Sequence, residues 1–169
     1  AHALESNQWA GKEHYLFKLL EALDKQPGVE LFVYSRKKLA KAELLLSARC
    51  RFVSKQLPTP IWQLWLLINL KQKKIDHFLA PCTYLASALN FRRPQTVVIH
   101  DLSTWLPNIK KTHPLIPRLK EKIILALAIR NSRHVVAISK NTKKDLEKYF
   151  PSQKEKIRVI YQGLRLPAI

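Results

Sequence analysis

The sequence predicts an α/β protein with a doubly wound, mainly parallel sheet and helices on both faces. Short apolar runs rich in β-branched residues alternate with longer runs of helical periodicity along the whole chain. The run 96–99, for example, consists of Thr, Val, Val and Ile, which is typical of a strand buried on both faces of a parallel sheet. Because parallel strands need crossover connections, which are usually helices, the alternation itself indicates this fold class.

Length and composition agree with one globular domain. The chain has 169 residues and is 47% hydrophobic, so it can bury an ordinary core, and disorder is excluded as an overall description. Its 30 Lys and Arg residues against 12 Asp and Glu residues give a formal net charge of +18. Such an excess favours a polyanionic partner, which can be a nucleic acid, a phosphorylated ligand or an anionic membrane surface.

The first half of the chain begins the alternation. Leucines and a phenylalanine at helical spacing predict a helix after Gly11, and Pro27-Gly28 ends it. The next predicted elements are a strand at 29–34, a helix at 36–48, a strand at 51–53 and a helix at 61–70. The apolar run 61–70 is too short to span a bilayer, which needs about 20 residues in a helix. Its two tryptophans beside a lysine cluster leave two interpretations, packing in a domain core or anchoring at a membrane interface.

The second half continues the alternation. The predicted elements are a strand at 75–80, a short helix or turn at 83–90, a strand at 95–100, a long loop at 101–117, a helix at 115–132, a strand at 134–138, a helix capped by Ser139 and a strand at 157–161. In the helix 115–132 we expect the inward-facing residues to be Leu119, Ile123, Ile124 and Leu127, with Ala126 and Ala128 as further candidates.

The cysteines and one histidine indicate structural roles. Cys50 and Cys82 lie far apart, with no CxxC spacing and no nearby histidine at metal-ligand spacing, so we expect both to be buried thiols. No zinc site or disulfide framework is predicted, which fits a reducing cytoplasm. His77 lies in the mostly apolar predicted strand 75–80, so we expect it to be satisfied within the structure and not to bind a ligand.

The candidate functional site lies where the predicted strand 95–100 ends. The apolar run stops there at His100-Asp101, and open parallel sheets place their ligands at the carboxyl ends of strands. Ser139 follows the strand 134–138 and is expected at the same edge, although it also suffices as an N-cap for the next helix. Gly11 precedes a helix start, where backbone N–H groups can approach an anion, and a simple turn is the alternative.

Four stretches carry a family resemblance when taken together. They read AGKEHY at 10–15, VIHDLS at 98–103, VVAISKNTKKDL at 135–146 and KIRVIYQGL at 156–164. In this order and spacing they resemble the amino-terminal half of family 4 glycosyltransferases of the GT-B fold, which are retaining enzymes that use nucleotide-activated sugars. The resemblance covers nearly the whole chain. It implies a Rossmann-like, acceptor-side domain at 1–163, the start of an interdomain linker at 164–169, and a carboxyl-terminal domain that is not in this sequence.

The sequence departs from the family pattern at three places. Gly11 lacks the second glycine that the family's loop commonly has, and Gln162 and Arg165 replace the common Asn and Asp near the hinge. The family also begins with a hydrophobic strand before the glycine loop, and we expect residues 1–4 to supply at most the tail of such a strand.

The resemblance implies a catalytic role for the His-Asp pair. His100 would hydrogen-bond the transferring sugar or its acceptor near the reacting centre, and Asp101 would orient local backbone or polar groups. A strand-end hydrogen-bonding pair is the structural alternative for both residues.

The resemblance also implies binding roles for four other residues. Gly11 and Lys12 would lie near the donor diphosphate, whereas Ser139 and Lys140 would line the acceptor side. No metal and no cofactor is expected, because basic groups and helix amino termini can stabilise a departing diphosphate, and the nucleotide-sugar is a co-substrate.

The implied function is transfer of a sugar, of hexosyltransferase type, from a nucleotide-sugar donor to a glycan, lipopolysaccharide or lipid-linked acceptor in cell-envelope polysaccharide biosynthesis. We expect this half alone to be inactive, and its location to be cytoplasmic and peripheral at the inner face of the cell membrane. Basic residues expected to dock on an anionic membrane are Lys71, Lys73, Lys74, Lys110, Lys111, Arg118, Lys120 and Lys122.

The alternative function is a non-catalytic basic fragment that acts as a membrane adaptor or a nucleic-acid-binding module. Only the charge favours a nucleic acid, because the sequence has no zinc finger, aromatic RNA-recognition signature or clear helix-turn-helix. We therefore expect nucleic acid not to be the partner.

Overall fold

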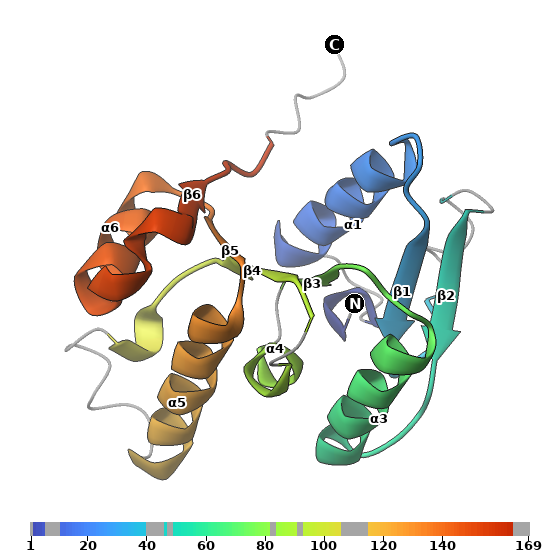
Figure 1. The fold of residues 1–169 in the computed structure, drawn as a ribbon, viewed down its shortest axis with the longest axis horizontal. Helices are drawn as coiled ribbons and strands as arrows, with labels where there is room; N and C mark the ends of the chain where they lie inside the picture. The colour runs from blue at the N-terminus through green and yellow to red at the C-terminus, as the bar shows by residue number, and fades with distance from the viewer. Residues whose placement is uncertain are drawn as a thin grey trace. The chain divides into compact units, whose positions relative to one another are not determined.

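The computed structural model describes residues 2–5, 11–39, 46, 49–81, 84–90, 93–105 and 115–163. The chain divides into two compact units, of which unit 1 comprises Ala1–Leu66 with Gly163–Ile169 and unit 2 comprises Leu67–Gln162. Figure 1 labels their helices and strands. Both units combine helices with parallel strands, which confirms the predicted α/β class, and the described strands form two separate sheets.

Unit 1 packs helix α1 (Gly11–Asp24) against a two-stranded sheet. Strand β1 (Leu31–Ser35) pairs in parallel with β2 (Cys50–Ser54) along their whole length. The core of this unit consists of Leu4, Leu16, Phe17, Leu20, Val33, Leu39 and Cys50. Burial, and secondarily the charge of Asp24, raises the pKa of the Cys50 thiol to about 11. The prediction of a buried thiol is confirmed for Cys50, whereas Cys82 lies outside the described residues.

At two places in unit 1 the observed secondary structure differs from the predicted one. Residues His2–Glu5 form a 3-10 helix, η1, and not the tail of a strand. A single turn suffices to bury Leu4 in the core, and the Glu5 carboxylate accepts a hydrogen bond from the Arg36 backbone N–H over 2.6 Å. Of the helix predicted at 36–48, residues 36–39 are not helical, and most of the remainder lies outside the described residues.

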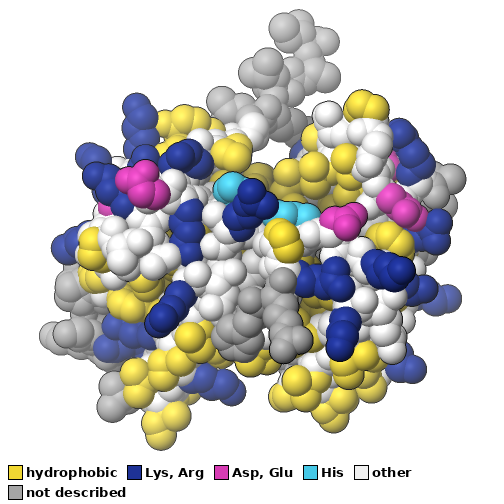
Figure 2. Space-filling view, viewed as in Figure 1, with side chains coloured by type: hydrophobic (Ala, Val, Ile, Leu, Met, Phe, Trp, Pro, Cys, Tyr) yellow, Lys and Arg dark blue, Asp and Glu magenta, His cyan; other side chains and the backbone are white. Residues whose placement is uncertain are grey.

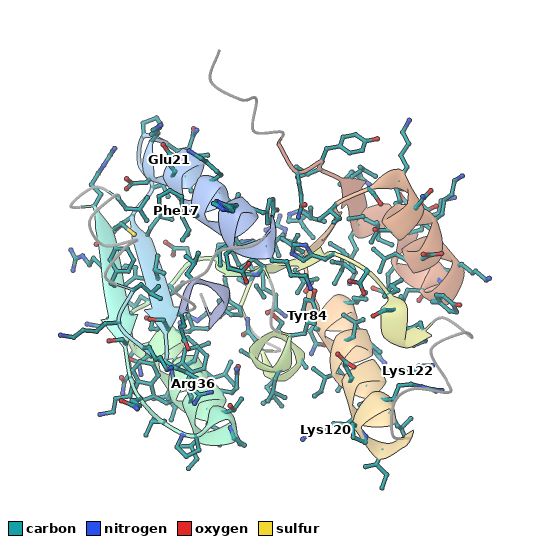
Figure 3. The ribbon with its side chains drawn as sticks, turned by 180° about the vertical axis from the view of Figure 1, so that it is seen from behind. Phe17, Glu21, Arg36, Tyr84, Lys120 and Lys122 are labelled. Atoms are coloured by element: carbon teal, nitrogen blue, oxygen red, sulfur yellow. The ribbon has the colours of Figure 1, made fainter. Side chains whose placement is uncertain are left out.

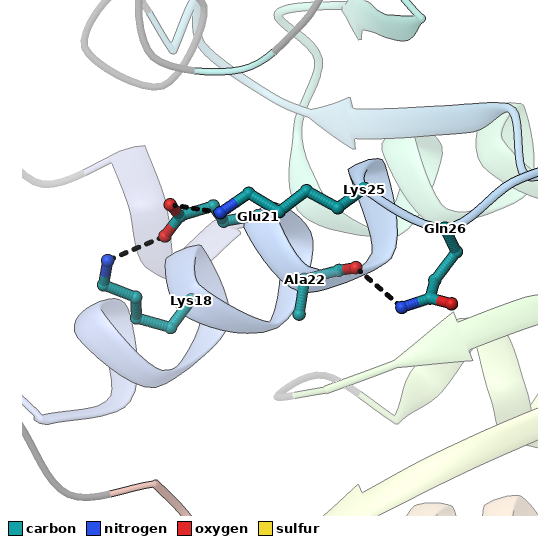
Figure 4. A network of polar contacts seen from close by, with 5 residues as sticks. All are labelled: Lys18, Glu21, Ala22, Lys25 and Gln26. Atoms are coloured by element: carbon teal, nitrogen blue, oxygen red, sulfur yellow. Dashed lines mark hydrogen bonds and ion pairs between the residues drawn. The ribbon is translucent and has the colours of Figure 1, made fainter.

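The exposed side of α1 carries a charged network (Figure 4). The Glu21 carboxylate accepts hydrogen bonds from the ammonium groups of Lys18, over 2.7 Å, and Lys25, over 3.2 Å. These bonds, from Lys18 and then Lys25, lower the pKa of Glu21. Exposed pairs of this kind contribute little to stability. We infer that the buried face of α1, which includes Phe17 (Figure 3), holds the helix in place.

Unit 2 is built on a four-stranded parallel sheet in the order β3-β4-β5-β6. The strands are β3 (Phe78–Ala80), β4 (Gln95–Ile99), β5 (His134–Ala137) and β6 (Ile157–Val159). The connections hold α4 (Leu85–Leu89), η2 (Ser103–Trp105), α5 (Leu115–Asn131), α6 (Lys140–Tyr149) and the 3-10 helix η4 (Pro151–Lys156). Each strand therefore pairs with the next strand along the chain. Each connection is long enough to cross over between two parallel strands.

The core of unit 2 follows from the β-branched strands. The fully or almost fully buried residues are Val97, Ile99, Leu125, Ala128, Ile129, Val135, Ala137, Leu146 and Ile157. The buried Gln95 side chain at the start of β4 is satisfied, because its amide nitrogen donates to the Ser87 and Asn90 carbonyls over 2.9 and 3.2 Å. The ring of His77 lies 2.9 Å from the Thr96 hydroxyl, which confirms that this histidine has a structural partner. Burial lowers the pKa of His77.

Helix α5 forms where it is predicted, but it turns a different face inward. Leu119, Ile123 and Leu127, which we expected to face inward, are 56%, 52% and 37% exposed. The buried face instead consists of Leu125, Ala128 and Ile129, together with the partly buried Ile124. The prediction is therefore wrong for Leu119, Ile123 and Leu127 and right for Ile124 and Ala128. The physical reason is that α5 has apolar residues on two opposite faces, and spacing alone does not say which one meets the sheet.

Helix α3 (Thr59–Gln72) also has two different faces. Trp62, Leu66 and Leu70 are buried, and the Trp62 ring N–H donates to the Ser35 carbonyl over 3.2 Å. Ile61 and Ile68, together with Leu64, are more than half exposed. Of the two interpretations of the apolar run 61–70, packing in a core therefore applies to one face of α3 only. In the described part of the chain, no helix is long and apolar enough to cross a membrane.

Candidate functional site

The candidate site is the carboxyl edge of the four-stranded sheet in unit 2. His100 directly follows β4, Ser139 lies two residues beyond β5, and Gln162 lies three residues beyond β6. Backbone hydrogen bonds of 3.3 and 3.0 Å continue the pairing from β4 to β5 and from β5 to β6 past the strand ends. Three segments that are far apart in the sequence therefore end together at one edge, which is where parallel sheets place their ligands.

The imidazole of His100 is held on both sides by the protein. Its Nε2 lies 3.0 Å from the Pro81 carbonyl oxygen, and its Nδ1 lies 3.1 Å from the side-chain nitrogen of Gln162. Because a carbonyl oxygen only accepts, Nε2 carries the proton and donates it to Pro81. An amide nitrogen only donates, so Nδ1 is unprotonated and accepts from Gln162. The two bonds select the neutral Nε2–H tautomer and fix the plane of the half-buried ring.

A second network ties the backbone of His100 to the turn after β5. Ser139 caps α6, because its hydroxyl oxygen accepts from the Thr142 backbone N–H over 3.0 Å. The Thr142 hydroxyl in turn donates to the His100 carbonyl over 3.2 Å and lies 2.9 Å from the Ser139 hydroxyl. The structural N-cap interpretation of Ser139 is thus confirmed. Lys140, the first residue of α6, is exposed beside it.

Asp101 is exposed and organises the turn after β4. Its carboxylate oxygen accepts from the Ser103 backbone N–H over 3.0 Å, which satisfies a donor at the start of η2. Its predicted role in transfer stays a prediction. Among the residues that the structure describes, no three His, Cys, Asp or Glu side chains are grouped so that they could hold a metal ion.

Aromatic packing supports this edge from α5 and α6. The Trp105 ring contacts Tyr149 and Phe150 at centroid distances of 5.3 and 5.0 Å. The ammonium of Lys122 lies 4.8 Å from the centroid of the Trp105 ring, and Figure 3 shows Lys122 extending from α5 on the side of η2. The Tyr84 hydroxyl donates to the Val98 carbonyl over 2.9 Å. Trp105 is therefore a packing residue, and residues 106–114 of the predicted functional loop lie outside the described residues.

Gly11 and Lys12 belong to unit 1, where they begin α1. A Cβ atom added at Gly11 would meet no atom within 4 Å, and its backbone is not in the left-handed region. The described protein atoms therefore do not require glycine at this position. A close approach of a bound anion to the first backbone N–H groups of α1 would be a reason for a residue without a side chain here.

Gly11→Ala is expected to weaken donor binding without lowering the stability of the fold. The midpoint of thermal unfolding should stay the same or rise slightly, because alanine is the better helix former by up to about 1 kcal/mol. Binding of a nucleotide-sugar to the complete protein should weaken about tenfold if the diphosphate approaches this backbone. Calorimetric titration and thermal unfolding of the same variant measure both effects. Unchanged donor affinity would remove Gly11 from the site.

Gln162 is the residue of this edge that sequence reasoning missed as a functional residue. It stands where the resembled family commonly has Asn, and only this departure singled it out. Thr142 and the Pro81 carbonyl were also missed, because a threonine inside a helix and a backbone carbonyl carry no sequence signal for a site. The cluster of His100, Gln162, Pro81, Ser139 and Thr142 is called the His100 edge below.

Gln162→Glu is expected to change the protonation of the His100 ring. A carboxylate can only accept, so Nδ1 must carry a proton to keep the contact, while Nε2 still donates to Pro81. The ¹⁵N resonances of the imidazole should show protonation on Nε2 alone at pH 7 in the parent and on both nitrogens in the variant. Gln162→Asn serves as the neutral control. Equal spectra for Gln162→Glu and the parent would show that Gln162 does not contact the ring.

Comparison with protein families matches residues 9–166 to the family described as Glycosyltransferase Family 4. The match contains both the start of α1 and the whole His100 edge. Comparison with curated proteins found no match.

Proposed function

The chain belongs to glycosyltransferase family 4, and from this membership we propose that it forms the acceptor side of an enzyme that transfers a hexose from a nucleotide-sugar. The proposed acceptors are a glycan, a lipopolysaccharide or a lipid-linked sugar of the cell envelope. The observation that carries the proposal is the His100 edge, which holds a neutral imidazole in one orientation where parallel sheets bind ligands.

The tautomer defines what His100 offers to a substrate. Nδ1 is a hydrogen-bond acceptor, and the side-chain amide of Gln162 occupies it in this structure. A sugar hydroxyl is also a donor and replaces this amide without leaving the nitrogen unpaired. The bond from Nε2 to the Pro81 carbonyl is retained and keeps the ring in place. Sugar binding thus exchanges one hydrogen bond of the ring for another.

The departing nucleoside diphosphate needs positive charge. In this proposal Gly11 and Lys12 contribute it at the amino end of the 14-residue helix α1, where the positive end of the helix dipole favours an anion. Ser139 and Lys140 line the acceptor side in unit 2. No metal and no cofactor takes part in this scheme. The proposed location is cytoplasmic, with the donor site completed by a carboxyl-terminal domain, so the 169-residue chain alone is expected to transfer no sugar.

A transfer assay tests the proposed function. The complete protein is incubated with a panel of nucleotide-sugars, with and without lipid-linked and glycan acceptors, and nucleoside diphosphate release is measured. We expect release that depends on the acceptor and a product whose anomeric configuration matches the donor. Activity with no nucleotide-sugar of the panel, while the folded protein binds them, would contradict the proposal.

A further inference from the structure

An apolar stripe covers the outward face of α5. Ile116, Leu119, Ile123 and Leu127 are 80%, 56%, 52% and 37% exposed, and they follow one another at spacings of three and four residues. Such spacing places side chains in one row along a helix. Isoleucine and leucine are residue types that ordinarily face a core. The face of α5 that packs in the core lies on the other side of the helix and consists of Leu125, Ala128 and Ile129. These four residues are called the α5 stripe.

Positive charge accompanies the α5 stripe. Helix α5 carries four basic residues and one acidic residue, which is Glu121. Lys120 and Arg130 are exposed and, by their positions in the sequence, lie on the same side of the helix as the stripe. In Figure 3, Lys120 extends from a different side of α5 than Lys122, which is engaged over Trp105. Figure 2 shows hydrophobic side chains beside Lys and Arg in the region where Figure 1 places α5.

From these observations we propose that α5 docks unit 2 on an anionic lipid bilayer, with the α5 stripe inserted among the acyl chains and Lys120 and Arg130 at the headgroups. An amphipathic surface with apolar residues on one side and lysine or arginine beside it matches both parts of such an interface. A second copy of the chain is the poorer partner, because pairing two α5 helices would bring their cations together. A nucleic acid would leave the aliphatic side chains of the stripe without a partner.

Helix α3, described by itself, repeats the arrangement. Ile61, Leu64 and Ile68 are exposed at spacings of three and four residues, and Lys71 lies near its carboxyl end. Lys73 and Lys74 follow directly and are exposed, and α3 contains no acidic residue. The buried tryptophan, Trp62, is not part of this exposed row. Both helices thus combine exposed aliphatic residues with cations, and the proposal rests on α5 because its stripe is longer.

Two substitutions that leave the charge unchanged distinguish insertion of the α5 stripe into the bilayer from general attraction of the protein, with its net charge of +18, to anionic lipids. Ile123→Asn removes one aliphatic side chain of the α5 stripe, and Ile160→Asn removes one that is equally exposed, at 52% and 55%, but lies beyond β6. Neither changes the net charge. Both positions are exposed, so both variants are expected to fold, and circular dichroism checks this. Leu119→Asn is a second variant of the α5 stripe.

The measurement is cosedimentation of the protein with vesicles of phosphatidylcholine alone or of phosphatidylcholine with phosphatidylglycerol. We expect the parent to bind the anionic vesicles, Ile160→Asn to bind them equally, and Ile123→Asn and Leu119→Asn to bind about tenfold more weakly. Equal binding of all variants, or equal binding to both vesicle types, would overturn the proposal. A dimer of the parent in sedimentation velocity that is lost in Ile123→Asn would also overturn the proposal. The same holds if a DNA or RNA duplex displaces the parent from the vesicles and Ile123→Asn binds that duplex less tightly.

Discussion

His100→Ala in the complete enzyme is expected to lower the rate of sugar transfer about a hundredfold, the usual loss when one oriented polar group is removed from a reacting centre. The parent ring is held by Pro81 and Gln162, so no side-chain entropy has to be lost when the sugar binds. Alanine removes both the acceptor nitrogen and the group that positions Gln162. Initial rates of nucleoside diphosphate release at saturating donor and acceptor measure the effect.

His77→Ala is the matched control for this prediction. His77 is a histidine of the same unit, bonded to Thr96, but it precedes β3 and therefore lies toward the opposite edge of the sheet. We expect this variant to retain most of the parent rate. Equal losses for the two alanine variants would point to general destabilisation, and a parent-like rate for His100→Ala would refute a role of His100 in transfer.

Leu146→Ala is expected to cost about 2–5 kcal/mol of the free energy of unfolding, the range for truncation of a leucine in a packed core. Leu146 is completely buried between α6 and the sheet, in the core cluster that includes Val135 and Ile157. The cavity left by alanine cannot fill easily, because the surrounding strand residues are β-branched and stiff. The midpoint of thermal unfolding should fall by roughly 5–15 °C, which scanning calorimetry measures.

Leu119→Ala provides the same chemical change at an exposed position. Leu119 is 56% exposed on α5, so its truncation is expected to change the free energy of unfolding by about 0.5 kcal/mol or less. Comparable losses for the two variants would mean that Leu119 packs inward, as the sequence pattern suggested, and that the assigned faces of α5 are reversed.

The strands of unit 2 could be predicted because their residues are unambiguous. The β-branched runs at 96–99 and 135–136 allow little besides a buried strand, and their predicted bounds lie within one residue of β4 and β5. The cap of α6 could also be predicted, since Ser139 stands between an apolar strand and a polar helix. The 3-10 helix η4 was missed, because its six residues after Phe150 are mostly polar and have no apolar periodicity.

The orientation of α5 could not be predicted from periodicity. Ile123 and Leu125 are two positions apart, so they lie on nearly opposite faces, and both faces are apolar. The larger aliphatic residues at 119, 123 and 127 suggested the inward face, whereas the structure places the smaller Ala128 with Ile129 against the sheet. The excess of large apolar residues over what the core uses is itself the signal for the α5 stripe.

The His100 edge could be predicted only in part. The sequence indicates that a strand ends at His100 and that Ser139 follows another, but Gln162, the partner of the Nδ1 atom, lies 62 residues away. The registers of β4 against β5 and of β5 against β6, which place Val97, Val135 and Ile157 side by side, together bring Gln162 to His100. Register depends on the packing of both strands and is not encoded in any single segment.

A crystal structure of the complete protein with a nucleotide-sugar and an acceptor bound would test the proposed role of the His100 edge most directly. We expect a sugar hydroxyl about 3 Å from Nδ1 of His100, in place of the Gln162 amide, with the bond from Nε2 to the Pro81 carbonyl intact. Both ligands bound with the contact between His100 and Gln162 unbroken, and with no sugar atom on the imidazole, would contradict it.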